Sequence, residues 1–344
     1  MRQSLRVLHV IRSDAFAGVE RHVANLAAAQ HDLGHRVRVI GGSPDHMQAV
    51  FGSRAIPVLA APTTMSILRI LGRTSDPDVV HAHMSAAEFA VTLAPHLRTV
   101  PLVATRHFAR RRGSSTLARQ LGMQVARRIA AQIAISHYVA DRIEGPSTVV
   151  HSGVPDRPDA GPYLNREKVA LVVQRLEPEK RTEVALGVFA ASGLAEDGWL
   201  LEVAGDGSER GRLELLASDL GIWQATRFLG SRSDCLELMD QARAIIAPCD
   251  IDGLGLSVVE AMSGGLPVIA AAAGGHRETV GRADDARLFT PGDASAGGDL
   301  LVALARDPGR AGRYGDELQT VQREKFSLTA QAQATIQVYR EVLR

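Results

Sequence analysis

The sequence predicts an α/β protein with two Rossmann-like domains, each built on a parallel β-sheet. Short apolar runs typical of buried strands alternate with helical patterns along the whole chain of 344 residues. The alternation is interrupted by a Pro/Gly/Asp-rich stretch, residues 153–163, and then starts again. Such a length suits two domains of about 150 to 170 residues.

The first block of strands begins with RVLHVI, Arg6–Ile11. A helix follows in which Val19, Val23 and Leu26 recur on one face, and Gly34 is placed to end it. RVRVIGG, residues 36–42, is the next strand and completes one βαβ unit. Further strands are expected at residues 78–83, 101–107, 131–136 and 148–153. Their near-continuous apolar character indicates strands buried on both faces.

The second block repeats this pattern after the linker. Strands are expected at residues 168–174, 199–205, 226–230, 244–248 and 267–270. The chain ends in a helical pattern from residue 327. We therefore predict an N-terminal domain over residues 1–156, a C-terminal domain over residues 157–326, and a final helix, residues 327–344, that packs back toward the N-terminal domain.

Composition favours a cytoplasmic enzyme. Cys235 and Cys249 are the only cysteines, too few for a disulfide framework. MRQSLRVLHVIR does not resemble a signal peptide, and no apolar run reaches the ~18 residues of a membrane span. Residues 1–160 hold 19 arginines against 11 acidic residues, a net charge of +8, whereas residues 161–344 carry −7. The two halves should therefore present different electrostatic surfaces.

The stretch DIDGLGLSVVEAMSGGLPVIA, Asp250–Ala270, is a candidate anion-binding loop. Gly253 and Gly255 would let the backbone approach a ligand where a helix starts, and helix N-termini favour phosphate. Two alternatives compete with this. Ser257 and Glu260 have the spacing of a capping box, which would bind nothing. Asp250 and Asp252 could form a divalent-metal pair, but the absence of a nearby third ligand disfavours a metal.

A cationic loop, QRLEPEKR, follows the first strand of the second block. Arg175 and Lys180 lie in it, and lysine is rare here, with three in the chain against 36 arginines. The pair could neutralise a diphosphate without metal. The competing interpretation is two surface cations paired with Glu177 and Glu179.

A basic stretch covers residues 89–140, which contain eight arginines and no acidic residue. Three interpretations remain open. The stretch could be a solvated basic face, or it could bind an anionic acceptor such as a phosphorylated sugar, a polyol or a lipid-linked phosphate. It could also contact an anionic membrane surface. Nucleic acid is disfavoured, because no aromatic residues interleave the arginines and no binding motif is present.

Several stretches together resemble the retaining glycosyltransferases of family 4, which have the GT-B fold of two Rossmann-like domains facing a central cleft. In the first half the resemblance rests on AGVERHVANLAAAQHDLGHRVRVI, DVVHAH and VVHSGV. In the second half it rests on QRLEPEK, VAGDGSER and DGLGLSVVEAMSGGLPVIAAAAGGHRE. The last stretch is the most specific, because Asp252 and Glu260 keep the spacing of the family's E-x7-E motif.

The resemblance implies an acceptor-binding N-terminal domain and a C-terminal domain that binds a nucleotide-sugar donor. It implies catalytic roles for Arg175, Lys180, Asp252 and His83, with Arg175 and Lys180 gripping the diphosphate and Glu260 the ribose. The donor-binding residues it implies are Gly18, Arg175, Lys180, Gly205, Leu229, Gly253, Leu254, Gly255, Leu256 and Glu260. The acceptor-side residues it implies are His83, His107, Arg106 and Arg110. Neither a metal nor another cofactor is expected.

The function expected is retaining transfer of a sugar from a UDP- or GDP-sugar to a hydroxyl of an unidentified small or anionic acceptor. The departing phosphate would take the proton of the acceptor, and the basic N-terminal domain would contact the inner face of a membrane. Alternatives from other classes are a sugar-nucleotide 2-epimerase, a phosphorylase and a non-catalytic sugar-nucleotide binder. Asp252 replaces the family's first Glu and Gln174 replaces a glycine, and these departures leave the donor sugar open.

Overall fold

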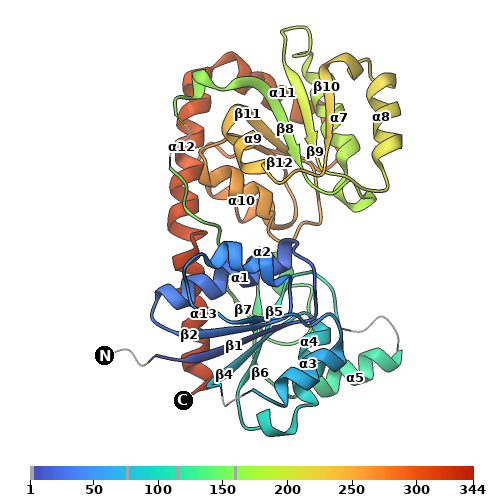
Figure 1. Cartoon of the computed structure of the whole chain (residues 1–344). Helices are drawn as coiled ribbons and strands as arrows, with labels where there is room; N and C mark the ends of the chain where they lie inside the picture. Colours follow the sequence, from blue (N-terminus) through green and yellow to red (C-terminus); the bar gives the residue numbers. More distant parts are fainter. Residues whose placement is uncertain (1–3, 75–76, 113–115, 159–160) are drawn as a thin grey trace. The chain divides into compact units, whose positions relative to one another are not determined.

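The structure is a computed structural model that describes residues 4–74, 77–112, 116–158 and 161–344 (Figure 1). The side chains of residues 116–119 and 121, and residues 159–160 of the predicted linker, lie outside this description. The chain divides into two compact units. Unit 1 comprises Met1–Gly153 together with Leu328–Arg344, and unit 2 comprises Val154–Ser327.

Unit 1 contains a parallel seven-stranded sheet. Its strands, in spatial order, are β3 (Val58–Leu59), β2 (Arg36–Ile40), β1 (Arg6–Ile11), β4 (Val79–His83), β5 (Leu102–Arg106), β6 (Ile129–Ala134) and β7 (Thr148–Val149). All neighbouring pairs are parallel, as the apolar strand sequences predict.

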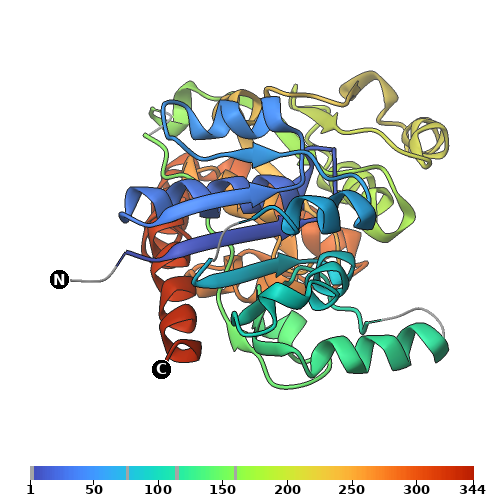
Figure 2. The same ribbon diagram turned by 60° about the horizontal axis from the view of Figure 1, so that its bottom comes forward.

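Helices cover both faces of the sheet in unit 1. They are α1 (Gly18–Asp32), α2 (Pro44–Phe51), α3 (Thr64–Leu71), α4 (Ser85–Thr92), η1 (Pro95–Leu97), α5 (Thr116–Ala126), α6 (His137–Ala140) and α13 (Leu328–Val342). One buried cluster joins α1, α2 and α13 to Val7 and Ile11 of β1. A second joins α3 and α4 to Leu8 and Val10, on the opposite face of that strand. Figures 1 and 2 show α13 beside α1, although they belong to opposite ends of the chain.

Unit 2 contains a parallel six-stranded sheet. Its strands, in spatial order, are β10 (Thr226–Gly230), β9 (Leu200–Ala204), β8 (Glu167–Val173), β11 (Ala242–Ala247), β12 (Val268–Ala271) and β13 (Leu288–Phe289). Its α-helices are α7 (Thr182–Ser192), α8 (Arg210–Asp219), α9 (Cys235–Gln241), α10 (Leu256–Ser263), α11 (Ala294–Arg306) and α12 (Pro308–Lys325). Its short 3-10 helices are η2 (Tyr163–Asn165), η3 (Pro178–Lys180), η4 (Trp223–Ala225), η5 (Gly274–Arg277) and η6 (Val280–Arg282).

Both sheets have the strand order of a doubly wound Rossmann fold. In each sheet, successive strands are added on one side of the first strand until that edge is reached, and the next strands are added on the other side of the first strand. The strand order therefore reverses between β1 and β4 in unit 1 and between β8 and β11 in unit 2. Loops at the carboxyl ends of the two strands at such a switch point form the usual ligand site of open α/β sheets. The predicted fold class is confirmed, and these two places are where the functional residues should gather.

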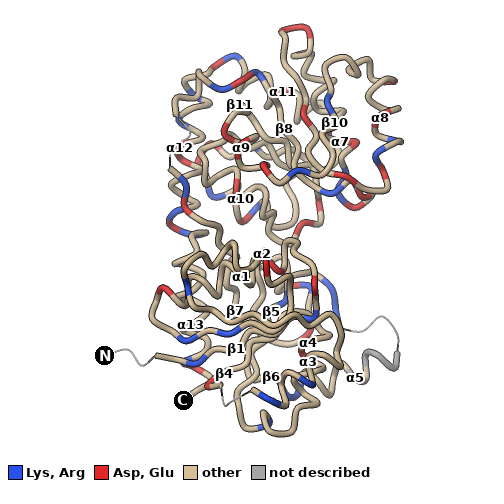
Figure 3. The backbone as a smooth tube through the Cα atoms, viewed as in Figure 1, with Lys and Arg blue, Asp and Glu red and all other residues tan. Residues whose placement is uncertain are grey.

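The strands expected from sequence all form, most of them shifted by one or two residues at an end. The sequence analysis missed β3 and β13, which are two-residue edge strands and too short to show a periodic pattern. Basic and acidic residues occur in both units (Figure 3), with acidic residues more numerous in the second half of the sequence. Among the described residues, no helix combines the length and the apolar composition needed to cross a bilayer.

Candidate functional site

In unit 2, an ion pair joins the two loops that meet at the switch point. Lys180 lies after β8 and Asp252 after β11, and the Lys180 Nζ donates a hydrogen bond of 3.0 Å to Asp252 Oδ2. Burial disfavours the charged form of Lys180, but the carboxylate of Asp252 outweighs this and raises the pKa of the ammonium group. Lys180 is therefore a permanent, oriented cation at the carboxyl edge of the sheet.

The glycine loop after β11 ends directly at the start of α10, as predicted. Gly255 is the N-cap residue, in a left-handed conformation with φ of 82°, and no side chain among the described residues caps the helix. The first N–H groups of α10, which form the positive end of the helix dipole, are therefore not covered by a capping side chain. The proposed capping box of Ser257 and Glu260 is wrong, because Gly255 is the N-cap residue and the helix already begins at Leu256.

A second glycine pair holds this loop in place. Gly275 donates its backbone N–H to the Asp252 carbonyl oxygen at 2.9 Å. A Cβ added to Gly274 would approach that same oxygen to 2.5 Å, and one on Gly275 would lie 2.3 Å from the Cα of Leu254. The Gly274–Gly275 pair is thus required for the close approach of two backbones, which fixes the position of Asp252.

The loop after β8 is tied to its neighbours by backbone packing and by Gln174. A Cβ on Gly205 would lie 1.8 Å from the Gln174 carbonyl oxygen, so only glycine fits there. The Gln174 side-chain amide donates to the Lys180 carbonyl oxygen at 3.0 Å and to the Thr182 hydroxyl at 2.9 Å. The residue that departs from the family's glycine therefore closes the loop that carries Lys180.

The other predicted donor residues of unit 2 are placed differently. Arg175 is exposed and forms an ion pair of 2.9 Å with Glu179, the partner suggested by the alternative interpretation. Such a pair is weak in water, so the Arg175 guanidinium can exchange Glu179 for a ligand. Glu260 is partly buried in the second turn of α10. Leu229 lies in the bulge of edge strand β10 and borders a cavity of about 230 Å³, and its donor contact stays a prediction.

Of the two acids considered as a metal pair, Asp252 is the one that bonds to Lys180. Lys180 occupies the place beside Asp252 where a divalent ion would supply charge. The pair neutralises Asp252 with an organic cation, and the expected independence of metal stays a prediction.

In unit 1, histidines fill the switch point. Parallel register places His9 of β1 beside His81 of β4, and Ile11 beside His83. Since alternate residues of a strand face the same side, His9, His81 and His83 all face α1 and α13. His22 from α1 and His107, which follows β5, complete a cluster of five buried imidazoles.

Hydrogen bonds link these rings to one another and to two helices. His83 bonds through one ring nitrogen to His9 at 3.0 Å and through the other to His107 at 3.1 Å. His9 also contacts the Gln30 side chain at 2.8 Å. Both nitrogens of His83 are therefore used inside the cluster and its side chain is fully buried, so the expected contact of His83 with a donor sugar or an acceptor is not available in this conformation.

All five imidazoles are neutral near pH 7. Burial is the main cause, and it lowers the pKa of His9 to about 4 and, together with Arg106, that of His107 to about 3. The pKa values of His22, His81 and His83 are likewise lowered well below the ordinary value by burial and by the neighbouring rings. The cluster supplies hydrogen-bonding groups rather than positive charge.

Two groups of three imidazoles have the spacing of metal ligands. His9, His81 and His83, and also His22, His83 and His107, each bring ring nitrogens within 4.8 Å of one another. Neutral imidazoles are good ligands for Zn²⁺ and related ions. Here, however, the ring nitrogens of His83 already bond to other rings at hydrogen-bond distance, which leaves it no lone pair for an ion without rearrangement.

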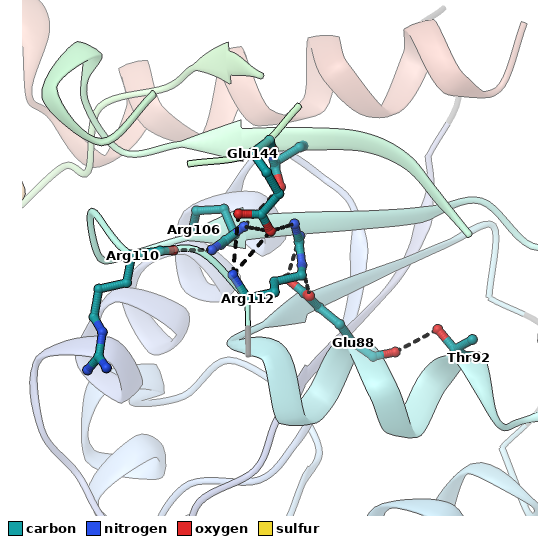
Figure 4. Close-up of polar contacts among 7 residues, drawn as sticks. Glu88, Thr92, Arg106, Arg110, Arg112 and Glu144 are labelled. Carbon is teal, nitrogen blue, oxygen red and sulfur yellow. Dashed lines mark hydrogen bonds and ion pairs between the residues drawn. The ribbon is translucent and has the colours of Figure 1, made fainter. Parts of the chain in front are cut away.

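Arg106, predicted on the acceptor side, has its side chain engaged inside the protein. Its guanidinium is buried, donates to Glu144 at 2.9 Å and also contacts the Arg110 carbonyl oxygen (Figure 4). Arg112 is buried as well and bridges Glu144 to Glu88, with its Nε 2.5 Å from Glu88. The interpretation of a solvated basic face therefore fails for these two arginines.

The acids that pair with them lie just outside the acid-free stretch, at its two ends in the sequence. Arg110 and Arg111, beside the buried pair, remain exposed and can reach a ligand, and Arg98 and Arg127 of the same stretch are exposed as well. Arg128 donates to two carbonyl oxygens, those of Leu97 and Val100, both at 2.6 Å. The side chain of Arg119 lies outside the described residues.

Gly18 starts α1 on an exposed turn after β1, where the Glu20 carboxylate accepts a hydrogen bond of 3.0 Å from the Ala17 N–H. Gly18, predicted as a donor-binding residue, is the first residue of this helix. Its contact with a donor, like the other assigned roles, stays a prediction.

Two family profiles together match most of the chain. The profile described as Glycosyltransferase Family 4 matches residues 16–157, and the profile described as Glycosyl transferases group 1 matches residues 159–319. The chain belongs to glycosyltransferase family 4.

Curated relatives agree with this assignment. A phosphatidyl-myo-inositol mannosyltransferase of Mycobacterium leprae is 29% identical over 332 residues, covering 88% of this chain and 87% of the relative. A glycogen synthase of Mycobacterium tuberculosis is 29% identical over 336 residues, covering 88% of this chain and 80% of the relative. The chain is accordingly a glycosyltransferase enzyme.

Solved structures show the same fold. Anabaena Alr3699/HepE, crystallised with UDP, matches with a TM-score of 0.78 at 19% identity, covering 98% of this chain and 100% of that one. The predicted GT-B fold of two Rossmann-like domains is confirmed for this glycosyltransferase.

Sequence reasoning missed much of the histidine cluster of this glycosyltransferase. His9, His22, His81 and Gln30 were not singled out, although DVVHAH carries a usable signal. Two histidines at alternate strand positions must face the same side, and polar residues on a buried face need partners. The partners come from β1, α1 and α13, and only the folded chain brings these together.

Strained backbone follows a site residue in each unit. Among the described residues, Met84 (φ 70°) and Arg181 (φ 57°) are the non-glycine residues with positive φ. They directly follow His83 and Lys180. Such conformations are uncommon for long side chains and cluster at functional sites, because the surrounding structure must hold them.

Proposed function

We propose that this glycosyltransferase transfers a sugar from a UDP- or GDP-sugar to a hydroxyl group of a small or anionic acceptor, with retention of anomeric configuration and without a metal. The observation that carries the proposal is the Lys180–Asp252 pair at the switch point of unit 2, four residues before α10 begins. Oriented positive charge and an uncapped helix N-terminus at one edge of a sheet suit a diphosphate.

The chemistry follows from where charge develops. As the bond between the anomeric carbon and the β-phosphate oxygen breaks, its electron pair stays on the phosphate, and the sugar becomes oxocarbenium-like. Lys180, Arg175 and the N-terminus of α10 would stabilise the departing diphosphate, which is catalysis by preorganised charge. The acceptor oxygen then bonds to the anomeric carbon on the same face, and its proton passes to the departing phosphate oxygen.

Asp252 would keep Lys180 in position and, with Glu260, would meet hydroxyl groups of the donor. The nucleotide part of the proposal is supported by structural neighbours of the same fold, since Anabaena Alr3699/HepE was crystallised with UDP and with UDP-glucose. A UDP-sugar is therefore the first donor to test.

Substitution of the two cations tests the site. Thermal-shift screening with UDP, GDP, ADP and dTDP sugars identifies the donor, because a ligand that binds the folded state stabilises it. With that donor, we expect Lys180→Ala and Arg175→Ala to lower kcat/KM by about 10²- to 10³-fold while the thermal unfolding midpoint changes little. Lys168→Ala is the matched control, since Lys168 is an exposed lysine of the same unit and donates to the Asp197 carbonyl oxygen. Near-normal turnover of both variants would refute the assignment.

On the acceptor side, we propose an anionic group and peripheral contact with the cytoplasmic face of a membrane. Exposed Arg110 and Arg111 follow Phe108, whose side chain is 54% exposed. An aromatic residue beside cations suits the interface of an anionic bilayer. The acceptor of the mycobacterial mannosyltransferase, a phosphatidylinositol by name, is consistent with this.

Vesicle binding separates the membrane from a soluble acceptor. The wild type should co-sediment with vesicles containing anionic phospholipid at low salt and dissociate at high salt, because the attraction is screened. The variant Phe108→Ser/Arg110→Ser/Arg111→Ser should not bind, whereas Arg98→Ser, another exposed arginine of unit 1, should bind normally. Equal binding of both variants would exclude this surface.

A further inference from the structure

The histidine cluster of unit 1 has a determinable order of protons. A neutral imidazole carries one N–H and one lone pair, so each ring can donate one hydrogen bond and accept one. All five rings are neutral near pH 7. His83 bonds to another ring at each of its two nitrogens, and His9 bonds to a ring at one nitrogen and to the Gln30 amide at the other. Once the direction of one bond is known, the directions along the rest of that chain follow.

Gln30 sets the direction. Its side chain is fully buried, its Nε2 donates to the Tyr339 hydroxyl at 3.2 Å, and its Oε1 faces the Nε2 of His9 at 2.8 Å. An amide oxygen only accepts, so His9 carries its proton on Nε2 and accepts at Nδ1 from the Nε2–H of His83. His83 in turn accepts at Nδ1 from the Nε2–H of His107.

The second branch from Gln30 obeys the same order. The Tyr339 oxygen accepts from Gln30, so its own hydrogen is free to be donated to the Nδ1 of His81, 2.5 Å away. His81 then holds its proton on Nε2 and donates it to the Thr105 hydroxyl at 2.6 Å. With the Gln30 amide oriented as in this structure, both branches are fully satisfied.

His22 is oriented independently from α13. Gln331 accepts at Oε1 from the Gly153 N–H at 2.8 Å, which turns its Nε2 donor toward His22 Nε2 at 3.1 Å. His22 therefore donates from Nδ1 to the Ser152 hydroxyl at 2.9 Å. It is the one member of the five whose proton lies on Nδ1.

The chain Gln30–His9–His83–His107 ends in a lone pair. His107 uses its proton toward His83, and its Nδ1 has no hydrogen-bond partner among the described residues. We propose that Gln30, acting through His9 and His83, sets the tautomer of His107 so that its Nδ1 accepts a hydrogen bond from a hydroxyl group of a bound sugar or acceptor. The contact to substrate rests on the proposed function, whereas the proton order does not.

The consequence for the reaction is orientation. A ring nitrogen that accepts a hydrogen bond from a hydroxyl group fixes the direction of the O–H bond and leaves the oxygen lone pairs free to react. The pKa of His107, lowered by burial and by Arg106 to about 3, keeps the ring neutral, so it holds the hydroxyl without removing its proton. Gln30, His9 and His83 are then positioning residues, and His107 is the ring that touches substrate.

Nitrogen-15 NMR of histidine-labelled protein tests the proton order without substrate. Two-bond proton–nitrogen correlations distinguish the tautomers of each neutral ring. We expect Nε2–H for His9, His81, His83 and His107, and Nδ1–H for His22. Rotation of the Gln30 amide by 180° would reverse every bond of the two branches that start at Gln30 and place the His107 proton on Nδ1, and observing that would overturn the proposal. Stoichiometric Zn²⁺ in the purified protein, lost in His83→Asn, would also overturn it.

Two substitutions, each close in shape to the residue that it replaces, test the role of Gln30. Gln30→Met removes the amide that sets the direction, and we expect the His107 spectrum to change from a single Nε2–H form to a mixture of tautomers. Thr105→Val is the matched control, since it removes the end of the other branch and leaves Gln30 and His9 in place. A retained Nε2–H form of His107 in a folded Gln30→Met variant would refute the control by Gln30.

The contact to substrate is tested with the nucleotide sugar that gives the largest thermal shift, and with the matching nucleoside diphosphate as probe. We expect the His107 Nδ1 resonance to move on saturation with the sugar or on addition of the acceptor, and Gln30→Met to lower kcat/KM about tenfold with Thr105→Val near the wild type. An unmoved resonance throughout turnover would overturn the contact. If no donor binds at all, the proposed function fails, while the tautomer result stands by itself.

Discussion

The two units have the same strand order at their switch points but fill them with opposite kinds of polar group. Unit 2 places a charged pair there, Lys180 and Asp252, on loops held by glycines. Unit 1 places five neutral imidazoles there, ordered by Gln30 and Gln331. Topology therefore decides where a site forms, and the side chains decide whether it stabilises charge or orients a hydroxyl.

Charge is also used in unit 1, but away from the switch-point histidines and inside the protein. The Arg112–Glu88 pair is almost completely buried, whereas Lys180 and Asp252 keep a fifth to a quarter of their side-chain surface exposed. Fully buried pairs are costly to break because one charge is left without compensation, and pairs that water reaches are cheaper to break. The pair in unit 1 should matter for stability, and the pair in unit 2 for activity.

The largest effect on stability is expected from the buried pair. Arg112→Ala leaves Glu88 charged in the interior and should lower the free energy of unfolding by about 3 to 5 kcal/mol. Chemical denaturation measures this, with Arg111→Ala as the adjacent exposed control. A loss below about 1 kcal/mol for Arg112→Ala would mean that the pair is hydrated and that the two units differ little in how their charged pairs contribute to stability.

Acid should weaken unit 1 before unit 2. The unfolded chain protonates its histidines below about pH 6.5, but folded His9 stays neutral down to about pH 4. The unfolded state then binds more protons, so the free energy of unfolding falls as the pH is lowered from 6.5 to 4, by about 1.4 kcal/mol per pH unit for this one histidine. Above pH 6.5 it contributes no pH dependence.

Hydrogen exchange resolves this prediction by unit. After correction for intrinsic rates, amides of β1 and β4 should lose protection between pH 7 and pH 5, while those of β8 and β11 change less. Parallel loss in both units would show that the histidine cluster is not the origin of the acid sensitivity.

Loss of the charged pair in unit 2 should reduce activity more than stability, in contrast to loss of the buried pair in unit 1. Asp252→Asn keeps the shape of the side chain but removes the carboxylate that orients Lys180, so transfer should fall about tenfold, which corresponds to about 1.4 kcal/mol. The free energy of unfolding should change by less than about 1 kcal/mol. Asp252→Glu restores the family's usual acid and should retain most of the activity. A large stability loss without an activity loss in Asp252→Asn would invert the comparison.

The smallest effects concern the strained residues after His83 and Lys180. Met84 has φ of 70° and ψ of 151°, a region that belongs essentially to glycine, whereas Arg181 has the milder left-handed values of 57° and 36°. Met84→Gly should therefore stabilise the protein by about 1 kcal/mol, and Arg181→Gly should be nearly neutral because the entropy lost by glycine offsets the relief. Thermal unfolding of the two variants checks this, and equal effects would contradict it.

Predictions from sequence patterns were most reliable for features that are determined by residues adjacent in the chain. The glycine loop at Gly253–Gly255 and the start of α10 were predicted because backbone conformation is a local property. The same reasoning failed for Ser257 and Glu260, since their spacing fits a capping box but the helix begins earlier. It also missed β3 and β13, which exist only because a neighbouring strand offers hydrogen bonds.

The basic stretch shows why distant partners escape such reasoning. Residues 89–140 contain no acid, so eight arginines there suggested a surface. Glu88 and Glu144 lie just beyond its two ends, and folding brings both to Arg112. An acid-free window in sequence is therefore not acid-free in space, and Arg106 and Arg112 are interior residues.

The sequence by itself determined the fold class, the family, and the two loops that carry Lys180 and Asp252, because periodicity, glycine positions and motif spacing are local or ordered along the chain. The tertiary structure decided which charges are buried, that His83 is occupied by other rings, and that Gln30 and Tyr339 complete its network. Those properties depend on contacts between strands and helices far apart in the chain, and burial changes both the partners and the pKa of every group that takes part.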